Sequence, residues 1–188
     1  MDFETKKDLT SLHTFGVPWR TDYFGVVSNR DEVRDAVVFA EKTGVPLFVL
    51  GGGSNILPTD RFRGVVVHNQ IMGREIIDEN DDSVTLRVGA GENWNEFVLW
   101  CTEHGYHGLE NLALIPGTVG GAVVQNIGAY DVDVQRVTSS VEAIDLSTGD
   151  ERIFSNEECE FGYRQSIFKG TNTWCVSGVT FTLSKTFV

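Results

Sequence analysis

Residues 115–130 (IPGTVGGAVVQNIGAY) constrain the fold of this chain more than any other stretch. They contain four glycines and two alanines in sixteen positions and no charged side chain. Backbone with so little side-chain volume can approach a flat or charged ligand closely, because no Cβ intervenes. A second glycine cluster, residues 51–55 (GGGSN), follows the apolar segment 47–50. Two such loops indicate a cofactor with a phosphate end and a planar end; for either loop alone, a tight turn is the alternative.

The charge of the chain limits its partners. Its 188 residues include 27 acidic and 15 basic side chains, a net charge of −12. This balance argues against nucleic acid or an anionic membrane as the main partner. Neither glycine loop contains Lys or Arg, so a phosphate bound there would rest on backbone N–H groups. The Ser54 hydroxyl and the Asn55 amide would be additional donors.

The cysteines and the apolar segments indicate a cytoplasmic protein. Cys101, Cys159 and Cys175 are widely spaced and form no CxxC pair, so we expect reduced, buried thiols. We expect no secretion signal and no membrane span, because no apolar stretch has the required length. His104 and His107 could suggest a metal site, but Gly105 interrupts the helix between them and no third ligand is near in sequence. We therefore predict no metal site.

The hydrophobic pattern predicts a mixed α+β chain with two lobes. The first lobe, residues 1–69, reads as β-α-β-β, with strands at 23–28, 47–50 and 65–68. Its helix is predicted to begin at a capping Asp31 and to end at Gly44. The buried face of that helix would comprise Val33, Ala36, Val37 and Ala40.

The second predicted lobe, residues 70–188, is richer in strands. Alternation predicts a strand at 84–88, and the pair Asn93 and Glu96 predicts the start of a helix with Trp94 and Trp100 as packing residues. Residues 141–154 read as a hairpin around Ser-Thr-Gly-Asp, and a last strand is predicted at 174–183. The acidic stretch 78–82 is predicted to be a hairpin turn, since it lacks the glycine and the terminal glutamate of a calcium loop.

The first glycine cluster matches neither of two common nucleotide-binding motifs. It lacks the G-x-G-x-x-G that opens a helix in dinucleotide-binding folds, and it lacks the Gly-Lys-[Ser/Thr] of a Walker loop. Pro58 and the polar residues around it argue against a long helix after the cluster. A nest of consecutive N–H groups therefore remains the physical basis for phosphate binding.

Several segments, in the same order, resemble the UDP-N-acetylenolpyruvoylglucosamine reductase family of bacterial cell-wall precursor synthesis. They are residues 12–16 (LHTFG), 51–57 (GGGSNIL), 89–94 (GAGENW), 108–117 (GLENLALIPG), 125–130 (QNIGAY) and 161–169 (FGYRQSIFK). The resemblance implies a two-lobed FAD-binding fold of the vanillyl-alcohol-oxidase/PCMH type, with the flavin between the lobes. Neither glycine loop contains His or Cys, so non-covalent FAD is expected.

The resemblance also implies which residues bind FAD. Those expected to hold the pyrophosphate are Gly51, Gly52, Gly53, Ser54, Asn55, Ile56 and Leu57. Those expected along the flavin ring and ribityl chain are Ile115, Pro116, Gly117, Gly120, Gly121, Asn126, Gly128 and Ala129. Val176, on the last strand, is expected at the adenine end.

In this family NADPH reduces FAD, and the reduced flavin converts UDP-N-acetylglucosamine enolpyruvate to UDP-N-acetylmuramate for peptidoglycan. Arg164 matches the catalytic arginine that also contacts substrate, and Tyr163 matches a substrate-contacting tyrosine. A guanidinium suits this role because it supplies a permanent charge and several fixed donors to a developing oxyanion. Outside this motif, an Arg in such a position would be read as a surface or salt-bridge residue.

Two departures from the family pattern affect the interpretation. Family members continue for a further C-terminal, substrate-binding domain with a proton-donor serine, and neither Ser166 nor Ser177 matches that serine. We therefore expect either an enzyme part that needs the missing domain in cis or in trans, or a flavin-binding module without turnover. Asp131 stands where many relatives have glycine, which implies local strain if that position has φ > 0.

Overall fold

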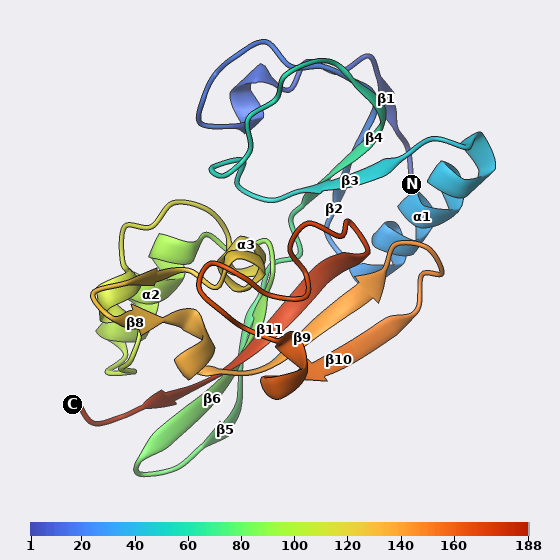
Figure 1. Ribbon diagram of the computed structural model, residues 1–188. Helices are drawn as coiled ribbons and strands as arrows, with labels where there is room; N and C mark the ends of the chain where they lie inside the picture. Colours follow the sequence, from blue (N-terminus) through green and yellow to red (C-terminus); the bar gives the residue numbers. More distant parts are fainter. Residues whose placement is uncertain (188) are drawn as a thin grey trace.

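The computed structural model describes residues 1–187 and contains two larger β-sheets with helices packed against them (Figure 1). The first sheet has four strands in the order β1-β2-β4-β3. They are β1 (Glu4–Thr5), β2 (Thr21–Val27), β4 (Phe62–Asn69) and β3 (Leu47–Leu50). β4 pairs in parallel with both β2 and β3. The three predicted strands of this region are confirmed, and β1 was not predicted.

Helix α1 (Arg30–Thr43) connects β2 to β3. Its predicted start was wrong: Asn29, not Asp31, is the capping residue, and its side chain accepts a hydrogen bond from the Glu32 N–H at 3.0 Å. Asn29 has the extended backbone that a cap requires, whereas Asp31 already lies in the first helical turn. Gly44 ends the helix with φ of 67°, as predicted, because only glycine adopts that conformation without strain.

The second sheet is antiparallel and has five strands in the order β10-β9-β11-β6-β5. They are β10 (Glu151–Ser155), β9 (Thr138–Asp145), β11 (Trp174–Ser184), β6 (Ser83–Gly89) and β5 (Arg74–Glu79). The predicted hairpin is β9–β10. The acidic stretch is the β5–β6 turn, where the Asn80 side chain accepts hydrogen bonds from the Asp82 and Ser83 N–H groups, both at 2.9 Å.

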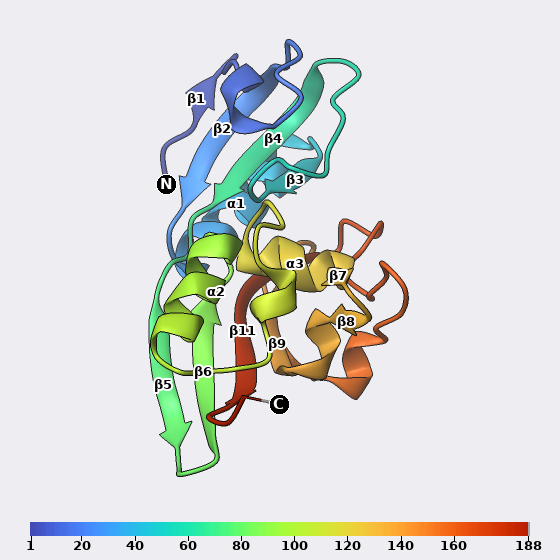
Figure 2. The same cartoon turned by 90° about the vertical axis from the view of Figure 1, so that its left-hand side faces the viewer.

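Helices α2 (Trp94–Glu103) and α3 (Val119–Gln125) lie on one face of the second sheet (Figure 2). The Asn93 side chain caps α2 as predicted, accepting a hydrogen bond from the Glu96 N–H. Trp94 and Phe97 of α2 are buried together with Phe181 of β11, with ring centroids 5.3 to 6.2 Å apart. Such an aromatic cluster contributes several kcal/mol of apolar burial, on the order of 2 kcal/mol per ring.

Short elements complete the chain. They are the two-residue strands β7 (Gly128–Ala129) and β8 (Val132–Asp133) and the 3₁₀ turns η1 (Thr10–Leu12), η2 (Glu110–Leu112), η3 (Val134–Arg136) and η4 (Glu157–Cys159). The β7–β8 turn places Tyr130 at φ of 53° and Asp131 at φ of 60°. Asp131 therefore occupies a left-handed position, as the departure from glycine suggested.

The two sheets are joined through the end of β4. The Asn69 amide donates to the Val176 carbonyl oxygen at 2.8 Å, which links β4 to β11. Ile71 lies so close to β6 that a Cβ at Gly89 would meet its carbonyl oxygen at 2.3 Å. Ile144 and Cys175 of the second sheet pack into the same core as α1. The predicted lobes on either side of residue 69 share this core. The boundary between them therefore stays a prediction.

All three cysteines are buried, as predicted. Burial raises the pKa of each thiol to about 12. No helix within residues 1–187 combines the length and the apolarity needed to cross a membrane.

Candidate functional site

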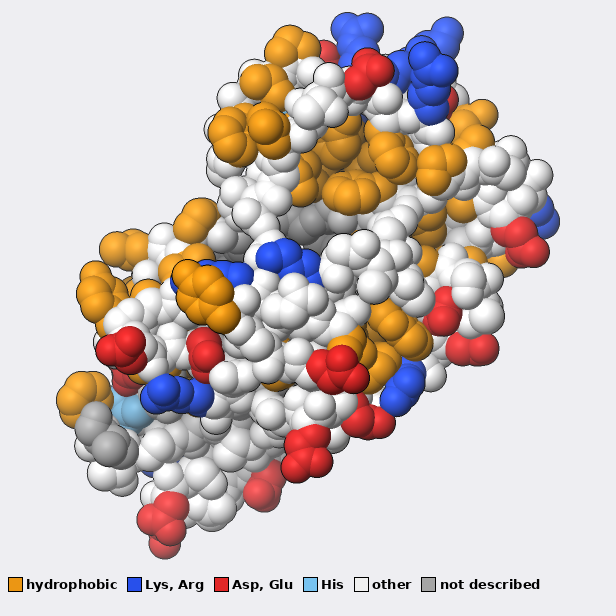
Figure 3. All heavy atoms as spheres, in the orientation of Figure 1, with side chains coloured by type: hydrophobic (Ala, Val, Ile, Leu, Met, Phe, Trp, Pro, Cys, Tyr) orange, Lys and Arg blue, Asp and Glu red, His pale blue; other side chains and the backbone are white. Residues whose placement is uncertain are grey.

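A fissure of about 640 Å³ lies between the first sheet and helix α3. Figure 3 shows it as a hollow with apolar side chains above and basic side chains along its lower edge. Three stretches supply most of its wall, and the remainder comes from Asn69, Ala90 and Trp94. The three are residues 48–56 after and within β3, residues 115–127 around α3, and residues 164–176 leading into β11.

The two glycine loops of the sequence meet at this fissure. A Cβ on Gly52 would lie 2.9 Å from the Gly117 Cα, and one on Gly51 would lie 2.9 Å from the Thr118 Oγ1. The Ser54 hydroxyl donates to the Pro116 carbonyl oxygen at 3.0 Å. The single hydroxyl proton of Ser54 is thus used in joining the loops, rather than offered to a phosphate as the sequence suggested.

The N-terminal segment supports the first loop from behind. Gly53 has φ of 65°, and a Cβ there would lie 2.0 Å from the Leu12 carbonyl oxygen. The Thr14 N–H donates to the Gly53 carbonyl oxygen at 3.1 Å. Residues 12–16 therefore shape the loop at residues 51–55, a role that the sequence did not reveal because the two segments are far apart in the chain.

Helix α3 brings the second glycine loop against the second sheet. Its cap is Thr118, whose side chain accepts a hydrogen bond from the Gly121 N–H at 3.3 Å. Gly120 packs on Ala90, since a Cβ at Gly120 would lie 2.9 Å from the Ala90 Cβ. Gly121 has only an ordinary contact of 3.5 Å and lines the fissure. One glycine of the pair thus permits packing, and the other leaves space for a ligand.

Arg164 forms part of the third wall. Its backbone is left-handed, with φ of 53°. Its guanidinium donates to the Gly128 carbonyl oxygen at 2.5 Å and reaches the Asn126 carbonyl oxygen at 3.5 Å. Gly128 must be small here, because a Cβ would lie 2.9 Å from the Arg164 Nη1. The neighbouring Tyr163 ring is 91% exposed and lies 5.3 Å from the Arg164 Cζ.

The structure gathers most of the predicted cofactor residues at the fissure. Those that line it are Gly51, Gly52, Gly53, Ser54, Asn55, Ile56, Ile115, Pro116, Gly117, Gly120, Gly121 and Val176, together with Arg164. The others lie outside its lining: Leu57 is exposed, Asn126 is buried at the C-terminal end of α3, Gly128 and Ala129 form β7, and Tyr163 is exposed to solvent. The Asn126 amide donates to the Gly162 carbonyl oxygen at 2.9 Å, so Asn126 positions the segment that carries Arg164.

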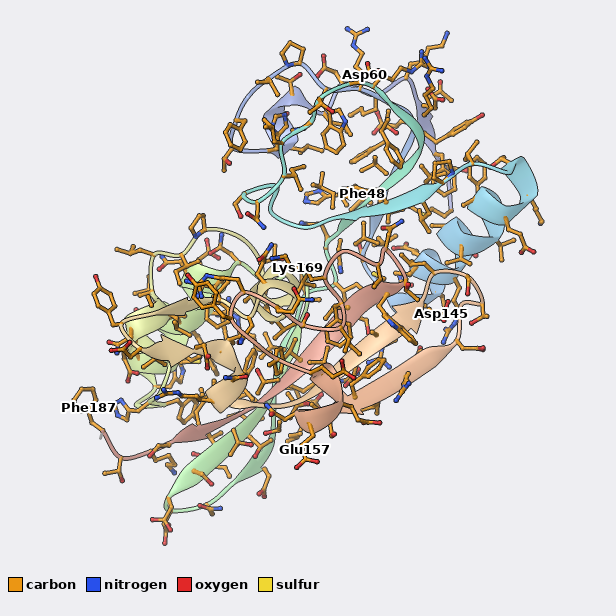
Figure 4. The ribbon with its side chains drawn as sticks, in the orientation of Figure 1. Phe48, Asp60, Asp145, Glu157, Lys169 and Phe187 are labelled. Carbon is orange, nitrogen blue, oxygen red and sulfur yellow. The ribbon has the colours of Figure 1, made fainter. Side chains whose placement is uncertain are left out.

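Sequence reasoning missed several residues of the wall. Phe48 and Lys169 lie on opposite sides of the fissure (Figure 4). Asn172 connects the loop before β11 to the first sheet, since its amide donates to the Leu47 carbonyl oxygen at 2.6 Å. Lys169 ends segment 161–169, which carries part of the family resemblance, but a lone lysine gives no signal in the sequence that it lies in a site.

The residues of the fissure fit a flavin dinucleotide. Apolar and aromatic side chains, including Phe48, Trp94 and Trp174, suit a planar ring system. The glycine loops leave backbone close to the cavity, where its N–H groups can meet a phosphate. Within residues 1–187 no His or Cys lines the fissure, which fits a non-covalent ligand.

This fold and its glycine-lined fissure are those of an FAD-binding domain, and the fold is similar to that of flavoproteins of the vanillyl-alcohol-oxidase type. The chain belongs to the FAD binding domain family, which it matches over residues 21–155.

Curated relatives agree with this assignment. The UDP-N-acetylenolpyruvoylglucosamine reductase of Pseudomonas putida is 40% identical over 187 residues, which are 99% of this chain and 55% of that protein. The enzyme of the same name from Amoebophilus asiaticus is 42% identical over 98% of this chain and 55% of its own length. The family resemblance read from the sequence is therefore confirmed, and the chain spans about half the length of these relatives.

Solved structures show the same fold. The UDP-N-acetylenolpyruvylglucosamine reductase of Thermus caldophilus superposes with a TM-score of 0.71 at 26% identity, covering 97% of this chain and 62% of that one. A flavoprotein of the vanillyl-alcohol-oxidase type from Myceliophthora thermophila gives a TM-score of 0.64 at 16% identity, over 88% of this chain and 32% of that one. The latter likeness concerns the fold alone.

Proposed function

We propose that this chain is the FAD-binding part of an NADPH-dependent reductase that converts UDP-N-acetylglucosamine enolpyruvate to UDP-N-acetylmuramate in the cytoplasm. The observation that supports it best is that both glycine loops and Arg164 line the same fissure. The similarity to reductases of that name supplies the substrate class.

The chain's own residues divide the work of binding. Backbone around Gly51–Gly53 would receive the pyrophosphate of FAD, since no side chain at these positions blocks an approach to the N–H groups. The apolar wall would exclude water from the ring and strengthen every electrostatic interaction inside. When bound, FAD supplies hydride transfer between NADPH and the substrate.

Arg164 would act on an anionic substrate. Its contacts with the Gly128 and Asn126 carbonyl oxygens fix the guanidinium in orientation. The remaining N–H donors can meet a carboxylate or enolate oxygen without a reorganisation cost. Tyr163, exposed beside it, would contact the same ligand from solvent.

Neither Ser166 nor Ser177 is a candidate for the proton donor of the reaction. The Ser166 hydroxyl donates to the Val124 carbonyl oxygen at 2.8 Å, and the Ser177 hydroxyl donates to the Glu142 carbonyl oxygen at 3.3 Å. Both serines are buried. We therefore propose that turnover needs the C-terminal half found in relatives, in cis or in trans. The second candidate function is a flavin-binding module without turnover.

The first test is the visible absorption spectrum of the purified chain, after FAD has been added and the excess removed. A retained flavin band supports an autonomous cofactor module. A folded but colourless protein would contradict the binding proposal for this chain.

Activity is tested separately, by NADPH oxidation with the enolpyruvyl UDP-sugar. We expect turnover only when the chain is joined to the C-terminal half of the Pseudomonas putida relative, and faster turnover with NADPH than with NADH. Arg164→Ala in that fusion should keep FAD and lose at least about a hundredfold in rate. Turnover by the isolated chain would contradict the need for a second half, and loss of FAD from Arg164→Ala would make Arg164 structural.

A further inference from the structure

We infer that Lys169 is a charged residue of the cofactor site: it holds the backbone of Arg164 and supplies positive charge to the phosphates of FAD. This inference rests on the proposed binding of FAD in the fissure. It answers a question left by the sequence, in which neither glycine loop contains a cation.

The charge at the fissure is opposite to that of the chain. Among residues 1–187, the charged side chains that line the fissure are Arg164 and Lys169, and both are basic. No Asp or Glu of this part of the chain joins them, although the chain has a net charge of −12. Basic side chains at the lower edge of the hollow are visible in Figure 3, and Figure 4 places Lys169 there. A cleft of one sign with apolar walls concentrates ligands of the opposite sign.

The two basic residues play different parts. The Arg164 guanidinium is turned to the Gly128 and Asn126 carbonyl oxygens. The Lys169 ammonium donates to the backbone carbonyl oxygen of Arg164 at 2.7 Å. An ammonium has three donors, so two remain for a ligand. Because Arg164 has φ of 53°, the same bond supports a left-handed backbone conformation that is unfavourable for a residue with a side chain.

Lys169 is also fixed in place from both sides of its loop. Asn172 ties the following residues to β3 through the Leu47 carbonyl oxygen. Phe168 before it is buried against the Phe154 ring, at a centroid distance of 5.2 Å. The lysine side chain is flexible by itself. Here the anchored backbone and the bond to the Arg164 carbonyl oxygen hold its ammonium in a defined position.

The experiment compares FAD binding by the wild-type chain, Lys169→Met and Lys169→Arg at low and high salt, about 0.02 and 0.3 M NaCl. Lys185→Met is the matched control, since it removes the same charge from a lysine that bonds to Glu79 and the Asn80 carbonyl oxygen, outside the fissure lining. We expect Lys169→Met to raise the Kd for FAD about tenfold at low salt and to flatten its salt dependence. Lys169→Arg should retain most of the affinity, and Lys185→Met should match wild type.

Riboflavin, which has the ring but no phosphate, separates a charge role from a structural one. Lys169→Met should bind riboflavin as the wild type does, and its Tm should fall by no more than a few degrees. An unchanged Kd for FAD at both salt concentrations would overturn the inference while leaving the proposed function intact. Equal losses for FAD and riboflavin would overturn it as well, because Lys169 would then only support the Arg164 backbone and would supply no charge to the phosphates. A wild-type chain that binds no FAD would contradict both the proposed function and this inference.

Discussion

Gly52 and Gly117 pack backbone to backbone, so closely that a Cβ on Gly52 would lie 2.9 Å from the Gly117 Cα. This contact joins the loop after β3 to the loop before α3, and the two are more than sixty residues apart in the chain. The absence of side chains therefore serves the closure of the site as well as access for a ligand.

Gly52→Val should separate these loops. The added volume meets backbone, which cannot rotate away, so we expect a destabilisation of about 1–3 kcal/mol and loss of FAD binding. Urea unfolding and flavin retention measure the two effects. Gly121→Ala is the control for stability alone, because its Cβ would make only an ordinary contact of 3.5 Å. It should leave stability equal or higher, and a Gly52→Val protein that binds FAD normally would remove the loop contact from the site.

Asp131→Gly should stabilise the chain. The left-handed conformation of Asp131 costs roughly 1–2 kcal/mol, whereas the additional backbone entropy of glycine costs about 0.5–1 kcal/mol. The net gain should be about 0.5 kcal/mol, measured by urea unfolding. Asp131→Ala keeps a Cβ and should show no gain, so equal stabilisation by both variants would attribute the effect to the carboxylate instead of the backbone.

Glu142→Gln should weaken the connection between α1 and the second sheet. The Glu142 carboxylate accepts hydrogen bonds from Arg30 on α1 and from Arg87 on β6, the latter at 2.6 and 2.7 Å, and its side chain is only 13% exposed. Removing its charge takes the shared carboxylate from both guanidinium groups, at a cost of about 1–2 kcal/mol. The cost is limited because Arg30 keeps Glu151 at 3.0 Å and Arg87 keeps Glu75 at 3.9 Å.

Thermal unfolding of Glu142→Gln checks this expectation. Glu158→Gln is the comparison, since the Glu158–Arg152 pair on the surface is about half exposed and should matter less. Equal Tm changes in the two variants would show that burial does not strengthen the Glu142 contacts.

Alkaline pH should destabilise the protein through its buried thiols. Burial raises the pKa of Cys175 from its ordinary value of 9.0 to about 12. Between these two values the folded state keeps the thiol proton and the unfolded state releases it. The free energy of unfolding is therefore unaffected by this thiol below pH 9 and falls as the pH rises toward 12. Each such thiol lowers the free energy of unfolding by up to about 1.4 kcal/mol per pH unit in that window.

Cys175→Ala isolates this contribution. Its free energy of unfolding should fall less steeply than that of the wild type between pH 9 and pH 10.5, a window that follows from the raised pKa. Parallel curves for the two proteins would show that Cys175 ionises equally in the folded and unfolded states.

Helices α1 and α2 and most of the longer strands followed from local patterns in the sequence, whereas α3 and β5 were not predicted. The period of Val33, Ala36, Val37 and Ala40 predicted α1, and Gly44 predicted its end, because both depend on neighbours within a few residues. The cap was misplaced by two positions, since Asn29 and Asp31 are both good caps by composition and only the backbone decides between them. Strand β1 has two residues and was missed because its pairing with β2 is entirely non-local.

The sequence by itself determined that the chain has two loops of small residues and that a ligand can approach their backbone closely. Through the family motifs it also indicated which cofactor these loops suit. Only the tertiary structure decided that the Ser54 hydroxyl donates to the Pro116 carbonyl oxygen. It also decided that the Asn126 amide holds the segment that carries Arg164, through the Gly162 carbonyl oxygen, and that Lys169 lines the fissure. The conformational freedom of a glycine follows from its lack of a Cβ and can therefore be read from the sequence at any position. A hydroxyl, an amide or an ammonium has no role until folding sets its partner, because hydrogen bonds and charges act over a few ångströms between segments that the sequence keeps far apart.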